Sequence, residues 1–443
     1  MKAVLFKGIR QLELIDRPVP QPGPGQILLK VSLTGICMTD VHIYLGHFAV
    51  KPPRILGHEV TGEVVSTGSG VDSDWVGRSV GVFPAQFCGT CSPCLRGQQE
   101  LCENFKCLGN TSDGGFAEYT LVDASQLVDL NALTMEQAVW LEPLACIMLG
   151  LKRITIPKNS SGLVIGAGTL GKLMAQVLKI NNGARAAVVD PNPEKITEAK
   201  SLGALAGWPI PRTGPTSDVD TQINQWAPQG LQFVIDTTGS SVAIQRAFHW
   251  AGIGASILLF GVSDPQAVVQ FSPAEFFSKE LLLTAVAGMT QDSFKVAYRL
   301  LSTGKLNTSA LVGQRISLEE LPAHMERLAQ RSAAKTLVQR PIPLLYGGLH
   351  PELELRASSY RSFYSGHTAQ ITNALVASAV MSRLRGRKRA WPWTLAALGA
   401  AAVGAARVGA GRHFYSDVAA GALAGGLVGG LVPLLHPAEI VLG

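Results

Sequence analysis

The first 340 residues lack the excess of basic side chains that marks proteins binding nucleic acid. Residues 341–443 contain nine Lys and Arg against four Asp and Glu, so they hold +5 of the total net charge of +6. Only +1 remains for the longer part, and we expect no nucleic-acid partner. The N-terminus also lacks the apolar stretch of a secretory signal, which favours a reducing, cytoplasmic setting.

Cysteine is scarce, with seven residues in 443, but four of them lie close together. They follow the pattern Cys-x2-Cys-x2-Cys-x7-Cys and are Cys88, Cys91, Cys94 and Cys102. In a chain without an export signal, this spacing indicates metal rather than disulfides. Four thiolates leave no place for a substrate, so we expect a structural zinc ion. Cys107 and Cys146 fall outside the pattern and are expected to be small core residues.

A glycine-rich turn joins a short apolar strand (161–165) to a helical run (172–180) and a second strand (186–190). The turn has the form G-x-G-x-x-G and contains Gly166, Gly168, Thr169, Leu170 and Gly171. Asp190 closes the second strand, where a carboxylate can bind the hydroxyls of an adenosine ribose. This context favours a dinucleotide site over an ordinary glycine turn. Asp190 is followed directly by Pro191, Asn192 and Pro193, with no Arg to neutralise a 2′-phosphate, which favours NAD, although Lys195 keeps NADP open.

A second metal site is indicated by Cys37 and His58, whose thiolate and imidazole are zinc ligands 21 residues apart. Two ligands do not make a site, and we expect Glu142 to be the third. Catalytic zinc keeps its fourth position open for water or substrate. The alternative is a buried cysteine and a satisfied core histidine.

These motifs occur in a fixed order: G-I-C-M-T-D-V-H (35–42), G-H-E (57–59), the four-cysteine loop, D-G-G-F-A-E-Y (113–119), E-P-L (142–144) and the nucleotide turn. Over residues 1–340 the chain resembles the zinc-dependent medium-chain alcohol and polyol dehydrogenases. With Glu at position 142 the chain resembles the sorbitol and threonine dehydrogenase branch of that family, in which a Glu replaces the Cys of the liver-type enzymes.

The resemblance implies roles for individual side chains. It places Cys37, His58 and Glu142 around a catalytic zinc, with Glu59 as an alternative or transient ligand. By the same resemblance Thr39 and His42 form a proton relay through a cofactor ribose hydroxyl, and Asp40 orients His58. An exposed, inert His42 is the alternative for the relay. The expected cofactors are therefore two zinc ions per chain and NAD.

The expected fold class is α/β with three parts. The first is a GroES-like β-barrel catalytic domain (1–150 and 288–340), with strands at 26–31, 63–67 and 79–83. The second is a Rossmann NAD-binding domain (151–287), with further strands at 233–236, 255–260 and 281–287. The third is an Ala/Gly-rich all-α tail (341–443). We expect a homodimer or homotetramer assembled through the cofactor domains, acting on a small alcohol whose identity the motifs leave open.

The tail contains Y-S-G-H-T (364–368) and Arg407-x5-His413-x3-Asp417. Both stretches resemble signatures of the type 2 phosphatidic acid phosphatase superfamily. The resemblance implies that His413 is the nucleophile and Asp417 orients it. It also implies that His367 protonates the leaving group. The phosphate would be held by Ser365, Gly366 and Arg407. Two unrelated histidines in an apolar helical bundle are the alternative.

The tail also departs from that superfamily. Ala333 stands where its first signature has Lys, and only three apolar helices are expected between 368 and 435. Helices of this length barely span a bilayer, so membrane contact through 368–435 stays open. A zinc-dependent oxidoreductase using NAD is the main hypothesis. The alternatives are a bifunctional phosphatase–dehydrogenase and a non-catalytic membrane-associated scaffold.

Overall fold

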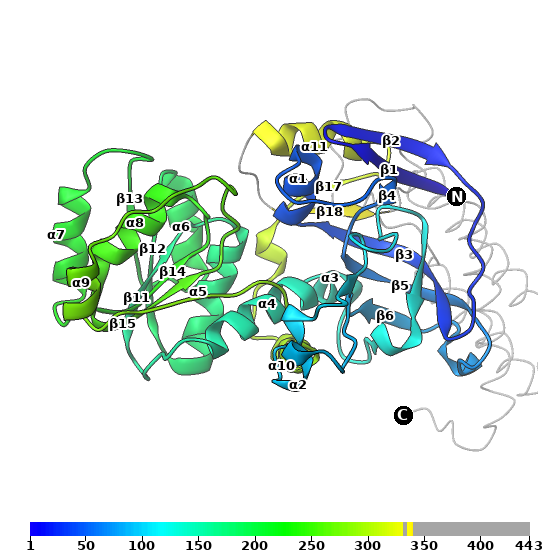
Figure 1. Cartoon of the computed structure of the whole chain (residues 1–443), viewed down its shortest axis with the longest axis horizontal. Coiled ribbons are helices and arrows are strands. Elements are labelled where there is room, and N and C mark those ends of the chain that lie inside the picture. The colour runs from blue at the N-terminus through cyan, green and yellow to red at the C-terminus, as the bar shows by residue number, and fades with distance from the viewer. Residues whose placement is uncertain (331–334, 340–443) are drawn as a thin grey trace, which may run out of the picture. The chain divides into compact units, whose positions relative to one another are not determined.

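The described structure has two halves, and residues 161–302 form the second. Six parallel strands form its sheet, in the order β13-β12-β11-β14-β15-β16 (Figure 1). The computed structural model describes residues 1–330 and 335–339. The six strands are β11 (Ser161–Ile165), β12 (Arg185–Asp190), β13 (Ala206–Pro209), β14 (Leu231–Asp236), β15 (Ala251–Leu259) and β16 (Leu282–Ala285). In chain order this is 3-2-1-4-5-6, the order of dinucleotide-binding sheets, which confirms the predicted Rossmann part.

Helices cover both faces of this sheet, which explains why its strands are almost continuously apolar. In β11, Leu163 and Ile165 belong to one core and Val164 to the opposite core, because successive side chains of a strand point to opposite faces. The helices of this half are α5 (Thr169–Asn182), α6 (Pro193–Ser201), α7 (Ser217–Trp226), α8 (Ser241–Trp250) and α9 (Pro273–Ser278). Helix α10 (Gln291–Ser302) follows and packs mainly against the helix at Leu141–Lys152.

The first half of the described structure, formed by residues 1–140 and the returning segments 303–330 and 335–339, is rich in antiparallel strands. A seven-stranded sheet has the order β10-β6-β5-β3-β18-β17, with β9 also paired to β3, and a smaller sheet joins β2, β1 and β4. The strands are β1 (Lys2–Gly8), β2 (Gln11–Asp16), β3 (Gln26–Ile36), β4 (Arg54–Ile55), β5 (Glu59–Thr67), β6 (Ser79–Val82), β7 (Ala85–Gln86), β8 (Lys106–Cys107), β9 (Tyr119–Asp123), β10 (Leu127–Asp129), β17 (Val312–Ile316) and β18 (Lys335–Gln339).

The strands predicted at 26–31 and 63–67 are present but longer than predicted, since β3 continues to Ile36 and β5 begins at Glu59. The chain also returns to this sheet after the parallel one. Helix α11 (Leu321–Gln330) is followed by β18, which pairs antiparallel with β3 and parallel with β17.

One helix connects the two halves. Helix α4 (Leu141–Lys152) contacts α10, and its Leu144 lies in a core that contains Phe83 from the first half and Leu173 from the second. Burial of large apolar side chains such as Trp140, which is 1% exposed, fixes the start of α4. Glu142 is therefore held in the first turn of a rigid helix.

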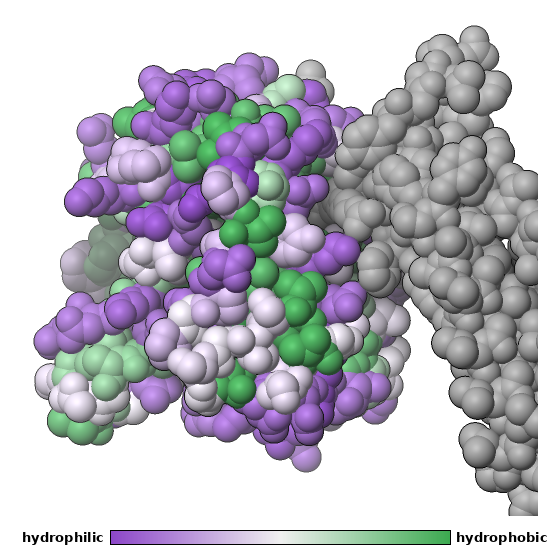
Figure 2. All heavy atoms as spheres, turned by 90° about the vertical axis from the view of Figure 1, so that its right-hand side faces the viewer, coloured by the Kyte–Doolittle hydropathy of each residue, from purple (hydrophilic) through white to green (hydrophobic). Residues whose placement is uncertain are grey.

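The outer side of the β-rich half is mainly hydrophilic, with a narrow band of hydrophobic side chains (Figure 2). Seven large apolar side chains in and around β15, α9 and β16 are also exposed. They are Ile253, Val262, Val268, Phe271, Phe277, Leu282 and Leu283. Among the residues that the structure describes, no helix has the length and apolar character needed to cross a membrane.

Candidate metal and nucleotide sites

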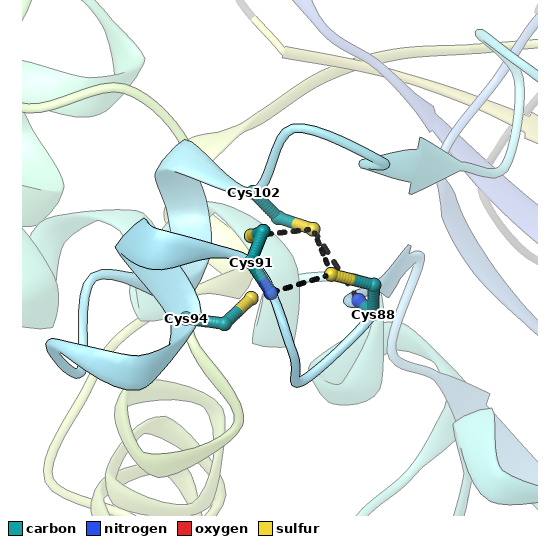
Figure 3. Close-up of side chains that lie close together, drawn as sticks. All are labelled: Cys88, Cys91, Cys94 and Cys102. Atoms are coloured by element: carbon teal, nitrogen blue, oxygen red, sulfur yellow. Dashed lines mark hydrogen bonds between the residues drawn. The ribbon is translucent and has the colours of Figure 1, made fainter.

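The four cysteines of the short-spaced pattern converge in one loop. Their sulfur atoms turn toward one another around the short helix α2 (Ser92–Leu95) and the 3-10 turn Gln99–Leu101 (Figure 3). The sulfur of Cys102 lies 3.5 Å from that of Cys88 and 3.8 Å from that of Cys91. A tetrahedral zinc ion with bonds of about 2.3 Å would separate its sulfur ligands by about 3.8 Å. The spacing therefore fits zinc.

The surroundings of the four sulfurs also suit thiolates. The backbone N–H groups of Cys88 and Cys91 each donate to a cysteine sulfur at 3.3 Å. Hydrogen bonds from the backbone of Thr90 and Cys91 lower the pKa of Cys88 to about 5. Burial raises the pKa of Cys94 to about 12, a shift that a bound cation reverses. Without a cation, four crowded thiolates would repel one another.

The second group brings together Cys37, His58 and Glu59. One ligand atom from each lies within 4.8 Å of the others, so sulfur, imidazole and carboxylate face a common point. Cys37 caps helix α1 (Met38–Leu45), while His58 and Glu59 stand at the start of β5. Cys37 is half-buried, and the other two side chains are buried. This donor set fits zinc.

Asp40 organises this group from a fully buried position. Its carboxylate accepts hydrogen bonds from the backbone N–H groups of Cys37 at 2.9 Å and Gly57 at 3.2 Å. The same carboxylate lies 3.5 Å from Nδ1 of His58. Burial alone would lower the pKa of His58, but Asp40 and a hydrogen bond with Cys37 raise it well above 6.5. Because Asp40 holds Nδ1, Nε2 is the nitrogen left for a metal.

Glu142 lies beside this group but is not one of the three side chains that share the common point. Its Oε1 accepts a hydrogen bond of 3.4 Å from the thiol of Cys146, one helical turn further along α4. Burial raises the pKa of Cys146 well above 9.0, and the charges of Glu142, Cys37 and Glu59 raise it further. Cys146 is therefore close enough to all three of these side chains for their charges to act on its thiol.

Cys107 occupies the same neighbourhood from β8. Burial raises its pKa to about 12, while the charge of His58 opposes this and that of Glu142 adds to it. Both extra cysteines were predicted to be small core residues. Cys146 does pack against the core that contains Leu144, and both cysteines are half-buried beside the candidate metal site. The sequence held one signal for this, since Cys146 follows Glu142 by four residues on one helical face.

The two predicted relay residues both lie on α1. The Oγ1 atom of Thr39 is 3.5 Å from the sulfur of Cys37. His42 follows Thr39 by three residues, so the two side chains share one side of the helix. Thr39 and His42 are both half-buried.

The nucleotide turn has the geometry that its glycines predict. Gly166 has a φ of +100°, and a β-carbon there would lie 2.6 Å from Oγ1 of Thr237. A β-carbon on Gly171 would overlap the carbonyl oxygen of Gly166, so helix α5 can approach the strand only with glycine at this position. By contrast, nothing lies within 4 Å of the corresponding point at Gly168. The open space beside the start of α5 is where a pyrophosphate is expected.

Asp190 lies at the end of β12, next to this turn. Its Oδ2 accepts from the N–H of Ala167 at 2.9 Å, and its Oδ1 accepts from the N–H of Asn192 at 2.8 Å. A carboxylate has about four lone-pair positions, so two protein donors leave capacity for ribose hydroxyls. Thr169 and Leu170 form the first turn of α5.

The predicted phosphatase residues lie outside the described residues: Ser365, Gly366, His367, Arg407, His413 and Asp417.

Comparison with families of known proteins gives three matches along the chain. Residues 23–132 match the alcohol dehydrogenase GroES-like domain, and residues 169–303 match the zinc-binding dehydrogenase family. Residues 327–440 match the PAP2 superfamily. D-arabinitol dehydrogenase 1 of Uromyces fabae is 32% identical over 347 residues, which cover 76% of this chain and 97% of that protein.

Solved structures show the same fold for the described part. A zinc-binding dehydrogenase from Sinorhizobium meliloti, bound to NADP, is 29% identical with a TM-score of 0.71. The match covers 76% of this chain and 98% of that one. An alcohol dehydrogenase from Escherichia coli CFT073, complexed with NADH, is also 29% identical with a TM-score of 0.70. In this case the match covers 76% of this chain and 99% of the other.

Proposed function

The chain belongs to the zinc-binding alcohol dehydrogenase family. We propose that it transfers hydride between an alcohol or polyol and NAD, at a zinc centre formed by Cys37, His58 and a carboxylate. One observation carries this proposal. Sulfur, imidazole and carboxylate atoms lie within 4.8 Å of one another in a chain whose other half is a nucleotide-binding sheet. The arabinitol dehydrogenase similarity supports a polyol as the substrate class.

Two carboxylates compete for the third ligand position. Glu59 lies with Cys37 and His58 around the common point. Glu142 lies beside it and accepts a hydrogen bond from the thiol of Cys146. We propose that Glu142 completes the zinc site and that Glu59 is the alternative ligand. Zinc bound there would act as a Lewis acid that makes a substrate hydroxyl acidic near neutral pH, and the bound nicotinamide would accept the hydride.

The protein's own residues have separate tasks in this reaction. Asp40 fixes the orientation of His58, so that the imidazole presents Nε2. Thr39 and His42 receive the proton that the substrate hydroxyl releases. The four-cysteine loop would hold a second zinc ion, which replaces the hydrophobic core that so short a loop lacks.

The choice of NAD over NADP rests on Asp190. Its carboxylate would bind the ribose hydroxyls of NAD and repel the 2′-phosphate of NADP. Similar proteins have been crystallised with each cofactor, so the residue at this position carries the argument. Asp190→Ala should therefore weaken the binding of NAD and reduce the discrimination against NADP. Equal use of both cofactors by the wild-type protein would contradict the assignment.

The activity itself is testable with the full chain. Zinc content is measured first, with about two ions per chain expected. A panel of polyols, sugars, amino alcohols and secondary alcohols is then followed by NADH absorbance. Formation of NADH that is lost when a chelator removes zinc would support the proposal. A zinc-replete protein that reduces neither NAD nor NADP with any member of the panel would overturn it.

We also propose a cytoplasmic homodimer or homotetramer assembled through the cofactor-binding half. Strand β16 is the edge of the parallel sheet, and Leu282 and Leu283 on it are 50% and 38% exposed. Exposed edge strands with apolar side chains are prone to pair with another chain. Light scattering on the wild type and on Leu282→Lys would test this, since the charge should favour monomers.

A second activity is favoured by the match of residues 327–440 to the PAP2 superfamily. In a bifunctional protein the tail would release an alcohol from a phosphate ester, and the dehydrogenase would oxidise it. His413 would attack phosphorus, with Asp417 orienting it. Release of inorganic phosphate from phosphatidic acid vesicles, lost in His413→Ala, would support this. Equal release by both proteins would contradict it.

A further inference from the structure

A second histidine lies directly against His42. Helix α1 ends at Leu45, and Gly46 follows with a φ of +81°, a left-handed conformation that glycine adopts readily. This turn sends the chain back over the helix, and the N–H of His47 donates to the carbonyl of His42 at 2.8 Å. The Nδ1 atoms of the two imidazoles are 3.3 Å apart, and their ring centroids are 5.6 Å apart.

This contact constrains the protons of both rings. When both rings are neutral, one Nδ1 must donate and the other must accept, so the two rings are opposite tautomers. Each ring keeps its Nε2 for another partner. His42 is half-buried and His47 is exposed, so the pair joins the interior of the site to solvent.

We propose that His47 is the exit of the proton path that begins at the alcohol. This rests on the proposed dehydrogenase function. A proton arriving at Nε2 of His42 displaces the proton on Nδ1 of His42, which moves to Nδ1 of His47. Nε2 of His47 then releases its proton to water. The alcohol thus loses one proton to solvent while its hydride goes to NAD, and both rings return to their first tautomers by exchange with water.

The charges around the pair suit transient protonation. Asp264, in the loop after β15, is near enough for its negative charge to raise the pKa of His42. Burial and the neighbouring His47 act in the opposite direction and are stronger, so the pKa of His42 is lowered below 6.5. His42 is therefore neutral and ready to accept a proton at neutral pH.

The remaining charged groups that face α1 have partners of their own. Glu326 on α11 accepts from Tyr44 and pairs with Arg10, and Asp40 accepts from Cys37 and Gly57. None of these contacts involves His42 or His47. Among the charged groups of the described residues, His47 and Asp264 are therefore the ones that act on the pKa of His42.

The test is His47→Asn in the zinc-replete full chain, with His249→Asn as the matched control. His249 is an exposed histidine on α8 that faces Asp220 of α7. Loss of the exit should lower kcat for alcohol oxidation about 10- to 100-fold with little change in KM, because a positioned proton acceptor contributes roughly 10²-fold or more. Added imidazole should restore the rate of His47→Asn. The control should keep the wild-type rate.

A second readout does not need turnover. Imidazole resonances of the protein without substrate are titrated by NMR in the wild type and in His47→Asn. Removing the neighbouring like charge should raise the pKa of His42, and the acidic limb of the kcat profile should move to higher pH with it. A wild-type kcat in His47→Asn, a loss that imidazole does not rescue, or an unchanged His42 titration would overturn the proposal.

The two proposals fail in different ways. If the wild-type protein forms no NADH with any alcohol, the dehydrogenase function fails, while NMR still reports whether the imidazoles are coupled. If the wild type is active and His47→Asn is equally active, only the exit through His47 fails.

Discussion

Two glycines of the nucleotide turn should respond in opposite ways to the same substitution. Gly168→Ala places a methyl group where no protein atom lies within 4 Å, at a φ of −69° and a ψ of −172° that alanine adopts without strain. Folding should therefore be unaffected, or stabilised by about 0.4–1 kcal/mol because the unfolded chain loses freedom. The methyl group would occupy the space expected for the pyrophosphate.

Gly171→Ala meets a different environment. Its methyl group would overlap the carbonyl oxygen of Gly166, which also accepts a 3.3 Å hydrogen bond from Thr237. A backbone carbonyl cannot rotate away as a side chain can. Overpacking of this kind costs about 1–3 kcal/mol. For a domain of this size, each kcal/mol corresponds to a fall in Tm of about 2–4 °C.

The assay measures thermal unfolding and NAD affinity for both variants. Gly168→Ala should keep the wild-type Tm but bind NAD about 10- to 100-fold more weakly, since about 1–3 kcal/mol of overpacking then falls on the complex. Gly171→Ala should lose both Tm and affinity, because α5 must move. Wild-type affinity in Gly168→Ala would refute the placement of the pyrophosphate. An unchanged Tm in Gly171→Ala would refute the reasoning from close packing.

Other predictions concern the two metal sites and the hydrogen bond between Tyr44 and Glu326. Glu142→Ala should lose the catalytic zinc and turnover while NAD affinity stays near wild type, as metal analysis and calorimetry would show. Asp40→Asn should weaken zinc binding about 10- to 100-fold, measured by competition with a chelator, because the imidazole ligand loses its orienting charge. Cys102→Ser should remove the other zinc and lower the Tm, since structural zinc contributes to folding directly. The hydrogen bond from Tyr44 lowers the pKa of Glu326 below its ordinary value of 4.5. The ionised carboxylate therefore stabilises the folded protein fully above pH 4.5, and this stabilisation is lost as pH falls through the lowered pKa. The difference in Tm between wild type and Glu326→Gln should shrink as pH is lowered.

Local pattern was enough to predict much of the second half of the described structure. The strand at 161–165 has the bounds that its apolar run predicts. Helix α5 begins at Thr169, within the glycine turn and three residues before the predicted start at 172. These features depend on residues close in sequence, so periodicity and glycine placement reveal them. The four-cysteine loop was predictable for the same reason, because all its ligands lie within fifteen residues.

The contents of the catalytic site were less accessible from the sequence. The sequence supplied Cys37 and His58, but the distance from Glu142 to them depends on how α4 packs between the two halves. In the structure Glu59 shares the common point, and Cys146 holds Glu142. Long-range packing sets such distances, and no local pattern encodes it.

The sequence by itself determined the residue types: a donor set for zinc, a glycine turn for a dinucleotide, and a boundary near residue 340 where the composition changes. The tertiary structure alone decided which of these side chains face one another. It brought β18 back beside β3, placed Cys107 near His58, and folded His47 over His42. The reason is physical: residue type sets what a side chain can bind, whereas the packing of distant segments sets which partners lie within reach.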